Sequence, residues 1–416
     1  MSYIKQGTPA FQKANLALFA GGFCTFANLY CVQPLLPEFS EKFHISPTMA
    51  SLSLSLTTIA LAISMLLIGS LSEAWGRKPI MAFSMFTVSV LAVLVIFVPN
   101  FHLLLAFRIL QGIVFAGLPS IAMAYLSEEI DPASLGLAMG IYISGNTIGG
   151  LGGRIITGTL AEFFDWRVAI AGVGVLSVIA SVLFLVTLPS SKNFQPRSLK
   201  LGKLMKSMLS HLKDRGLLCL YGIGFLLMGS FVTLYNYIGF QLTAPPYSLS
   251  QTLVAWIFIV YLVGTFSSTW MGSLADQFGR HKVLWISILI MFLGAIITLN
   301  THLLIKIAGI AIFTFGFFGG HSIASSWVGR HATHDKAQAS SLYLFFYYVG
   351  SSAGGTAGGV FWTTFGWKGV IDMIVISLTL TLILSISIVL LAKKKSNEKA
   401  VTDHGSSILC KRSGTE

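Results

Sequence analysis

The sequence contains little charge for its length. Asp, Glu, Lys and Arg make up 10% of the 416 residues, whereas hydrophobic residues make up 54%. A soluble domain carries roughly 25% charged residues, so this composition excludes an ordinary water-soluble fold. The apolar residues occur in runs such as 52–71 and 80–98, close to the ~20 residues with which a helix crosses a hydrocarbon core.

Cysteine and nucleotide-binding motifs are also scarce or missing. There are four cysteines and no C-x-x-C pair, so the sequence predicts neither a disulfide framework nor a metal site. Cys24 and Cys31 are seven residues apart on one expected helix, roughly 10 Å along its axis, too far for a disulfide. No G-x-x-x-x-G-K-[ST] sequence occurs, which excludes a P-loop ATPase. We expect no cofactor and no bound metal.

Hydropathy predicts an all-α integral membrane protein of twelve transmembrane helices in two six-helix bundles. A polar stretch, 189–216, separates the two sets and is expected to be a central cytoplasmic loop. The expected bundles are 1–188 and 217–392, and the polar tail 393–416 is expected to be disordered. The expected spans are 14–36, 49–71, 80–98, 103–126, 134–160, 167–188, 217–242, 250–272, 283–300, 303–328, 338–362 and 367–392.

The basic residues are distributed unevenly between the two sides of the membrane. Lys and Arg total 27, and 21 of them fall in the termini and the loops on the same side. Only Lys42, Arg167 and Lys368 fall in loops on the other side. By the positive-inside rule, we expect a multi-pass protein of the cell membrane with both termini cytoplasmic. This asymmetry accounts for the net charge of +12, so no nucleic-acid partner is expected.

The two halves of the sequence are copies of one another. GSLSEAWGRK (69–78) recurs as GSLADQFGRH (272–281), at an offset of 203. PSIA at 119 and HSIA at 321 differ by 202, and the glycine ladders of spans five and eleven differ by 205. Each repeat has six spans. Because an even number of crossings returns the chain to the side on which it started, both copies have the same orientation in the membrane. Parallel repeats of this kind are found in transporters whose binding site lies between the halves.

These motifs give the chain a family resemblance. The pattern G-x-L-[AS]-[DE]-x-x-G-R-[KH], present in both loops, resembles the signature of the major facilitator superfamily, and RILQG (108–112) is similar to that family's Arg-x-x-Gln-Gly element. YCVQPLLP (30–37) resembles bacterial inner-membrane members of the arabinose-efflux-like and drug-efflux-like type. The resemblance implies a monomeric secondary transporter that exports a small solute by proton-coupled alternating access. Proton-coupled uptake of an anionic or neutral metabolite is the alternative.

The repeated loops are expected to act as a conformational latch. Glu73 and Arg77, like Asp276 and Arg280, are four residues apart and would face the same side of a helical turn. The resemblance implies that the acid caps a helix of the neighbouring bundle and closes the cytoplasmic side; the alternative is that the basic residues only set topology. The residues of this expected latch are Gly69, Glu73, Gly76, Arg77, Gly272, Asp276, Gly279 and Arg280.

The glycine ladders have two interpretations. Small residues spaced four apart form a face on which another helix can pack closely. Alternatively, Gly140 and GGLGG (149–153) resemble the antiporter motif of span five, although Gly150 stands where that motif has proline. The expected packing residues are Gly145, Gly149, Gly153, Gly350, Gly354 and Gly358.

Charged residues inside the membrane are costly and usually functional. Arg108 and Arg154 lie within expected spans, whereas the interiors of spans one, two, seven, eight, ten and eleven contain no Asp or Glu. A positive cavity suits an anionic, zwitterionic or neutral solute better than a cation. His321 is interpreted as either a structural residue or a proton carrier. The candidate substrate-binding residues are Arg108, Gln111, Arg154, Asn146, Tyr30, Gln33, Tyr235, Asn236 and His321.

Two other functional classes are disfavoured. Residues 350–354 match G-x-S-x-G, but a nucleophile elbow needs a strand-to-helix turn, and this match lies in a glycine-rich span. We therefore expect no enzyme activity. A channel is disfavoured because two repeated bundles joined by a long loop favour a rocking transporter.

Overall fold

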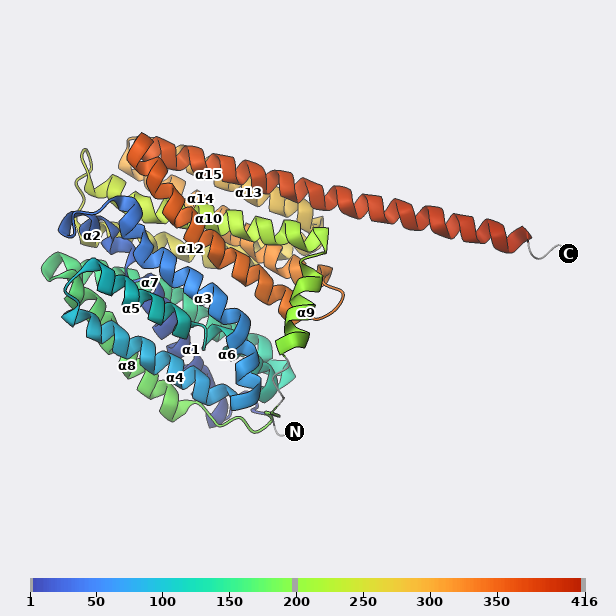
Figure 1. Ribbon diagram of the computed structural model, residues 1–416, viewed down its shortest axis with the longest axis horizontal. Helices are drawn as coiled ribbons and strands as arrows, with labels where there is room; N and C mark the ends of the chain where they lie inside the picture. The colour runs from blue at the N-terminus through green and yellow to red at the C-terminus, as the bar shows by residue number, and fades with distance from the viewer. Residues whose placement is uncertain (1–2, 197–200, 413–416) are drawn as a thin grey trace.

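The protein is built from helices arranged as two bundles that lie side by side (Figure 1). The computed structural model describes residues 3–196 and 201–412, with the side chains of Ser70, Leu201, Lys203 and 392–412 left undefined. Within these residues no β-strand occurs; an isolated bridge joins Ile4 to Ile130. The expected all-α class is therefore confirmed.

The first six spans make up the N-terminal bundle. Spans one and four each contain a break, so each consists of two helices. The helices are α1 (Pro9–Tyr30), α2 (Leu36–Lys42), α3 (Pro47–Trp75), α4 (Arg77–Leu94), α5 (Phe101–Phe115), α6 (Pro119–Glu129), α7 (Leu135–Phe163) and α8 (Trp166–Thr187). A short 3-10 turn, η1 (Gln33–Leu35), joins α1 to α2.

The second six spans make up the C-terminal bundle. Span eight is broken by the 3-10 turn η4 (Phe258–Val260). Spans eleven and twelve form one long element that bends at Gly366, whose φ is 62°. The helices are α10 (Arg215–Thr243), α11 (Gln251–Ile257), α12 (Tyr261–Phe278), α13 (Arg280–Ile297), α14 (Leu303–His331) and α15 (Lys336–Arg412).

These elements account for twelve membrane crossings. By length and composition, 10 of the described segments could cross a membrane, and one of these, Lys336–Leu391, contains both spans of α15. The twelfth is α7, which has 29 residues and is rich in glycine, so its hydropathy is lower. The predicted major facilitator architecture of two six-helix bundles is confirmed.

Local sequence signals start and stop these helices. Side chains of Thr8, Ser46 and Ser250 accept bonds from backbone N–H groups at the starts of α1, α3 and α11, the usual way of satisfying the first turn. Gly76 and Gly279 end α3 and α12 with φ of 96° and 93°. Only glycine adopts this conformation without strain, which explains why both copies of the repeated loop have it.

The glycine ladders lie against helices of their own bundle. A Cβ added at Gly145 or Gly153 would lie 2.5 Å from a backbone oxygen of α1, from Phe19 or Ala27 respectively. A Cβ at Gly354 would lie 2.6 Å from the Gly229 oxygen of α10. Gly149, Gly350 and Gly358 are equally crowded. The packing interpretation therefore describes this geometry, in which small residues let two helix backbones approach.

Two segments differ from the sequence-based expectation. The central loop contains the helix α9 (Leu201–His211), which packs against α15, while residues 197–200 lie outside the described part. The tail that was expected to be disordered continues α15 as a helix to Arg412 and projects beyond the bundles (Figure 1), and 413–416 again lie outside the description. Extending an existing helix needs no new nucleus, so polar residues can continue it.

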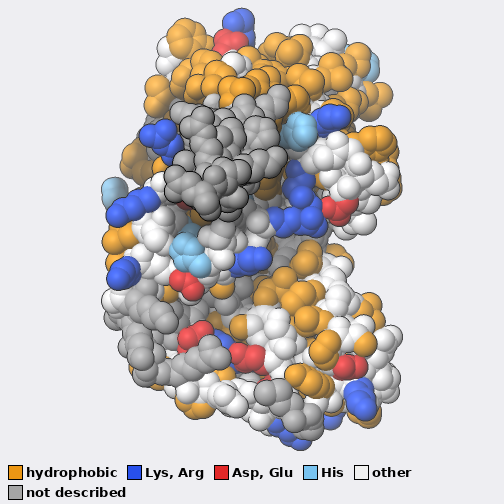
Figure 2. Space-filling view, turned by 90° about the vertical axis from the view of Figure 1, so that its right-hand side faces the viewer, with side chains coloured by type: hydrophobic (Ala, Val, Ile, Leu, Met, Phe, Trp, Pro, Cys, Tyr) orange, Lys and Arg blue, Asp and Glu red, His pale blue; other side chains and the backbone are white. Residues whose placement is uncertain are grey.

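The bundles touch closely at one end and separate at the other. At the end that contains α2 and α11, the closed end, α7 packs on α11 and α3 packs along α15. At the end that contains α9, the open end, a Cβ at Gly69 or Gly140 would meet no atom within 4 Å. Figure 2 looks onto this open end and shows a hollow between the two halves, with Lys and Arg side chains nearby.

Candidate functional site

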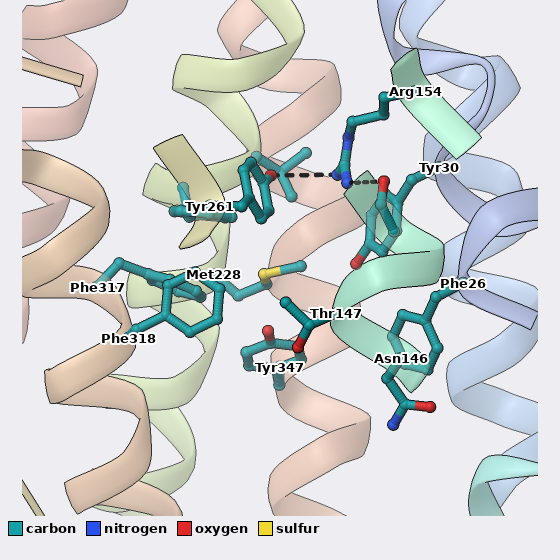
Figure 3. Close-up of a pocket in the computed structure, with 13 residues that line it drawn as sticks. Phe26, Tyr30, Asn146, Thr147, Arg154, Met228, Tyr261, Phe317, Phe318 and Tyr347 are labelled. Atoms are coloured by element: carbon teal, nitrogen blue, oxygen red, sulfur yellow. Dashed lines mark hydrogen bonds between the residues drawn. The ribbon is translucent and has the colours of Figure 1, made fainter. Parts of the chain in front are cut away.

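A cavity lies between the two bundles (Figure 3). Its volume is about 120 Å³, and α1 and α7 of one bundle and α10, α12, α14 and α15 of the other contribute to its wall. None of the lining residues is Asp, Glu or Lys. They are Phe26, Tyr30, Asn146, Thr147, Gly150, Arg154, Met228, Phe231, Val232, Tyr261, Phe317, Phe318 and Tyr347.

Arg154 is the charged group of this cavity. It projects from α7, is 1% exposed, and donates from Nε to Gln33 Oε1 at 2.7 Å, from Nη1 to the Gly150 carbonyl at 2.7 Å and from Nη2 to Tyr261 Oη at 3.1 Å. Its guanidinium carbon lies 4.3 Å from the Tyr30 ring centroid and 4.9 Å from that of Phe258. Aromatic faces attract the cation, and in a desolvated site each such contact contributes about 2 kcal/mol or more.

The Arg154 contacts join the two bundles. The Tyr261 hydroxyl belongs to α12, so the bond from α7 crosses the interface. Gln33 extends the link, because its Nε2 donates to Asn236 Oδ1 of α10 at 2.7 Å. Near the mouth of the closed end, the Thr252 backbone N–H donates to Glu162 at 2.8 Å. Hydrogen bonds therefore cross the interface from Arg154 outward to the closed end.

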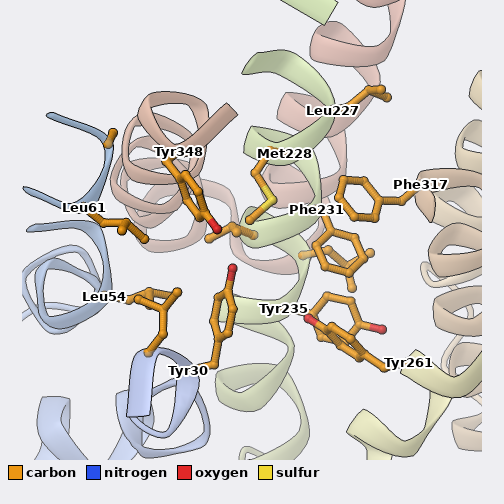
Figure 4. Close-up of a cluster of buried hydrophobic side chains, with 14 of the residues drawn as sticks. Tyr30, Leu54, Leu61, Leu227, Met228, Phe231, Tyr235, Tyr261, Phe317 and Tyr348 are labelled. Atoms are coloured by element: carbon orange, nitrogen blue, oxygen red, sulfur yellow. The ribbon is translucent and has the colours of Figure 1, made fainter. Parts of the chain in front are cut away.

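The opposite wall of the cavity is aromatic and apolar. Phe231 of α10 stacks on Phe317 with ring centroids 3.8 Å apart and meets Tyr261 edge-on at 5.4 Å. Figure 4 shows Met228 and Phe231 facing the space between Tyr30 and Tyr261. Aromatic side chains bury a large area with few rotatable bonds, so this wall is rigid as well as apolar.

Arg108 and Gln111 do not line the cavity. Arg108 is buried inside the N-terminal bundle, where Nε donates to the Ser53 carbonyl at 3.0 Å, Nη1 to the Asn28 carbonyl and Gln111 Oε1, each at 2.9 Å, and Nη2 to the Leu29 carbonyl at 2.7 Å. Two of these carbonyls belong to the last turn of α1. The negative end of that helix dipole stabilises the cation. Arg108 is therefore enclosed by polar acceptors that include Gln111, and both residues lie apart from those that line the cavity.

The remaining candidates lie at or behind the wall. Tyr30 and Asn146 line the cavity, whereas Gln33 and Asn236 lie behind Arg154. The Tyr235 hydroxyl lies 2.6 Å from that of Thr314, and its ring is tilted against the Tyr261 ring with centroids 4.8 Å apart.

His321 also lies beside the wall rather than in it. Its Nδ1 lies 3.0 Å from the Tyr343 hydroxyl, and its ring contacts two lining residues, Phe317 and Tyr347. If the Tyr343 hydroxyl donates, Nδ1 is the unprotonated nitrogen of the neutral ring; if the hydroxyl accepts, Nδ1 carries the proton.

The expected pairing in the repeated loops occurs in only one copy. Asp276 accepts from Arg280 at 2.8 Å and from Arg330 at 3.4 Å, as a pair within one bundle. In the other copy Arg77 instead donates to both carboxylate oxygens of Glu128, at 2.7 and 3.2 Å. Glu128 and Arg330 occupy the same place in the repeat, 202 residues apart. The acidic Glu128 therefore binds the loop arginine Arg77 directly, whereas the basic Arg330 binds Asp276 together with the loop arginine Arg280.

Sequence reasoning missed the aromatic half of the lining. Met228, Phe231, Tyr261, Phe317, Phe318 and Tyr347 were not candidates, because apolar and aromatic residues occur on every face of a membrane helix. One signal was available. The run FTFGFFGGH (313–321) concentrates aromatics and glycines around a histidine, which is unusual for a surface that only contacts lipid.

Comparison with known proteins agrees with this architecture. Residues 18–247 and 226–412 match the family model of the Major Facilitator Superfamily. A Bacillus subtilis (strain 168) relative, the uncharacterized MFS-type transporter YybF, is 58% identical over 92% of this chain and 95% of its own length. The multi-drug resistance efflux pump PmrA of Streptococcus pneumoniae (serotype 4) is 28% identical over 86% of this chain and 92% of its own length.

Solved structures give the same fold. The crystal structure of a bacterial homolog of the human lysosomal transporter Spinster, in an inward-facing and unoccupied conformation, aligns with a TM-score of 0.72 at 16% identity, over 93% of this chain and 98% of that one. With the family match over most of the chain, the twelve crossings and the cavity between repeated bundles, the chain belongs to the Major Facilitator Superfamily and is a multi-pass membrane transporter of a small solute.

Proposed function

We propose that the protein is a secondary active transporter that works by alternating access, with the cavity around Arg154 as its solute site. The observation that carries this proposal is the asymmetry of the bundle interface. Hydrogen bonds cross it from Arg154 to the closed end, whereas Gly69 and Gly140 face open space at the other end. A site closed on one side and approachable from the other is one of the two states that alternating access requires.

The charge distribution supports an orientation. The termini and loops at the open end carry most of the Lys and Arg residues, so by the positive-inside rule the open end faces the cytoplasm of the cell. In this orientation the cavity is loaded from inside. Export is therefore the proposed direction, and it agrees with the name of PmrA, a multi-drug resistance efflux pump. Uptake of a small anionic or neutral metabolite by the same cycle is the second candidate, because the cavity contains a cation.

The proton gradient is the proposed energy source. No carboxylate lines the cavity, so the coupling proton needs another carrier. His321 is the candidate, since it contacts the lining residues Phe317 and Tyr347 and is the side chain nearest them whose unperturbed pKa is close to neutral. Solute and proton would then exchange across the same wall, as in an antiporter.

The repeated loops have features that suit a second state, in which the open end is closed. A Cβ at Gly272 would be 3.9 Å from Ser322, and one at Gly69 would meet nothing, so neither glycine is needed for close packing in the present state. We propose that both become crowded when the open end closes and that Glu73 and Asp276 then contact the facing bundle. The protein is proposed to do this as a monomer, since each copy of the chain contains both bundles.

A transport assay with a plugged cavity tests the proposal. Purified protein in liposomes that contain a pH-sensitive dye is given an imposed pH gradient and a panel of small acids, sugars, amino acids and organic cations. We expect saturable, solute-dependent proton flux for at least one compound. Thr147→Trp should abolish this flux, because an indole would occupy most of a cavity of about 120 Å³.

The matched control is the neighbouring residue Ile148→Trp, whose side chain is 45% exposed on the outer surface of α7. This variant should retain the flux. Flux that rises without saturation would indicate a channel instead. Equal flux in the Thr147→Trp and Ile148→Trp proteins would rule out the cavity as the route.

A further inference from the structure

Arg154 is a buried cation with no anionic partner among the described residues. The side chain is 1% exposed, and among the described residues it makes no salt bridge. A guanidinium stays protonated, and a charge at membrane depth is costly even on the mildest insertion scales. The aromatic faces and neutral oxygens around Arg154 reduce this cost without cancelling the charge. Arg108, by comparison, donates to three backbone carbonyls and an amide.

Arg154 also has unused hydrogen-bond donors. A guanidinium has five N–H groups. Three of those of Arg154 are used, one each on Nε, Nη1 and Nη2. One N–H on each terminal nitrogen is thus left without an acceptor among the described side chains. Two such donors on neighbouring nitrogens match the two oxygens of a carboxylate.

The rest of the cavity is built for an apolar group. Met228, Phe231, Val232, Phe317 and Phe318 form the apolar part of its lining, whereas the polar side chains of the lining are those of Arg154, Asn146, Thr147 and the three tyrosines Tyr30, Tyr261 and Tyr347. An apolar protein cavity of about 150 Å³ accommodates benzene. The present volume of about 120 Å³ therefore fits a body of roughly one ring or a short alkyl chain.

We propose that the substrate is a small monocarboxylate with an apolar body, whose carboxylate binds Arg154 and whose body lies against Phe231 and Phe317. This inference rests on the proposed transport function and specifies its substrate class. An organic cation would be repelled by Arg154 with no acid to hold it. A neutral solute would leave the guanidinium uncompensated, and a dianion would bring a second charge into an apolar wall with nothing to pair with it.

Binding at Arg154 also has a consequence for the closed end. The bond to the Tyr261 hydroxyl, 3.1 Å, is the longest of the three that Arg154 donates and crosses between the bundles. An incoming carboxylate binds the second N–H of the same Nη2 and competes with this neutral hydroxyl for the orientation of the guanidinium, because a charge-assisted bond is about twice as strong as a neutral one. Substrate binding therefore weakens the α7–α12 contact that holds the cavity shut.

The test measures equilibrium binding to the purified full-length protein in lipid nanodiscs. Radiolabelled benzoate is the probe, and benzyl alcohol and benzylamine, similar in size but neutral or cationic, compete with it. Benzoate should bind at least tenfold more tightly than either. Arg154→Gln should weaken benzoate about 30-fold or more, since removing one partner of a buried charge pair costs 2–5 kcal/mol. It should change benzyl alcohol binding less than threefold.

Two further variants separate binding from folding. Arg167→Gln, an arginine outside the cavity that bonds Asp165 and the Val98 carbonyl, should leave benzoate affinity unchanged. Tyr261→Phe removes the competing hydroxyl and keeps the ring, so benzoate should bind as well as in the wild type or more tightly. If Arg154→Gln does not fold, Arg154→Lys replaces it, and it should weaken benzoate by losing the planar fork.

The proposal is overturned if folded wild-type protein does not bind benzoate, if benzylamine or benzyl alcohol competes as well as benzoate itself, or if the folded Arg154 variant retains wild-type affinity. Such a failure is distinguishable from a failure of the transport function. In that case another solute would still drive saturable flux that Thr147→Trp abolishes and Ile148→Trp does not.

Discussion

At the scale of single residues, the two membrane-embedded arginines have different roles. Arg108 binds three backbone carbonyls and Gln111 inside one bundle, whereas Arg154 faces the cavity and bonds to the other bundle. Arg108→Lys keeps the charge but cannot reach all four acceptors with one ammonium. Since each hydrogen bond to a charged group contributes about 1.5–3 kcal/mol, we expect this variant to lose about 3 kcal/mol of stability.

The measurement is the midpoint of thermal unfolding of the purified protein, together with benzoate affinity at a temperature where the variant is folded. The midpoint should fall by several degrees while affinity stays within threefold of the wild type. An unchanged midpoint with lost affinity would instead make Arg108 a solute ligand, which is the role that its depth in the membrane suggests from the sequence.

The sequence predicts how deep in the membrane each residue lies, but not which face of its helix the residue occupies. In a soluble protein the polar face of a helix reveals which side chains point inward, but in a membrane both faces are apolar. Charge is rare in the spans, and this was enough to select Arg108 and Arg154. Tyr30 and Asn146 were selected as polar residues. The sequence did not determine the direction of any of these side chains. Gln33 accepts from Arg154 and donates to Asn236, so both residues lie beside the cavity and not in its lining.

At the scale of helices, the seam between α1 and α7 depends on the absence of side chains. A Cβ at Gly145 would lie 2.5 Å from the Phe19 carbonyl oxygen, and the helices must separate to admit it. Gly145→Ala should therefore destabilise the protein by about 1–3 kcal/mol, as overpacking of a close contact does. Thermal unfolding of the purified variant measures this loss.

Gly140→Ala on the same helix is the matched control, because a Cβ there would meet nothing within 4 Å. This variant should be neutral or stabilising by up to about 1 kcal/mol, since alanine favours a helix more than glycine does. Equal destabilisation by both substitutions would show that the glycines of α7 serve backbone flexibility and not packing.

The number and order of the spans could be predicted from hydropathy, but their interruptions could not. The span 103–126 was expected to be continuous although Pro119 begins α6, and the 3-10 turn at Phe258–Val260 contains no proline or glycine that could have indicated it. That turn positions Tyr261 next to Arg154 and follows from packing of α11 on α7, a contact between distant segments. The helix α9 was hidden in a loop because its sequence is too polar to cross a membrane.

At the scale of the whole molecule, the orientation follows from 21 of 27 basic residues lying on one side. With Cys219 and Cys410 replaced by Ser, a cysteine introduced as Lys42→Cys, at the end of α2, should react with a membrane-impermeant maleimide in intact cells. Lys206→Cys, in α9, should react only after the cells are permeabilised. Labelling of the α9 cysteine in sealed cells would reverse the orientation and with it the proposed direction of transport.

Alternating access requires the closed end to open, and the structure offers a pair of positions with which to prevent it. The Glu162 carboxylate of α7 accepts from the Thr252 backbone of α11 at 2.8 Å, and these residues belong to different bundles. With Cys219 and Cys410 replaced by Ser, Glu162→Cys and Thr252→Cys can be joined by a short bis-maleimide. Joining them should abolish solute-driven proton flux, because the bundles must separate at this end for the solute to leave. The two proteins that carry only one of the introduced cysteines, treated with the same reagent, should transport normally, which controls for modification itself. Wild-type flux in protein that is fully cross-linked would mean that the solute passes without opening of this end, and the rocking of two bundles would have to be abandoned.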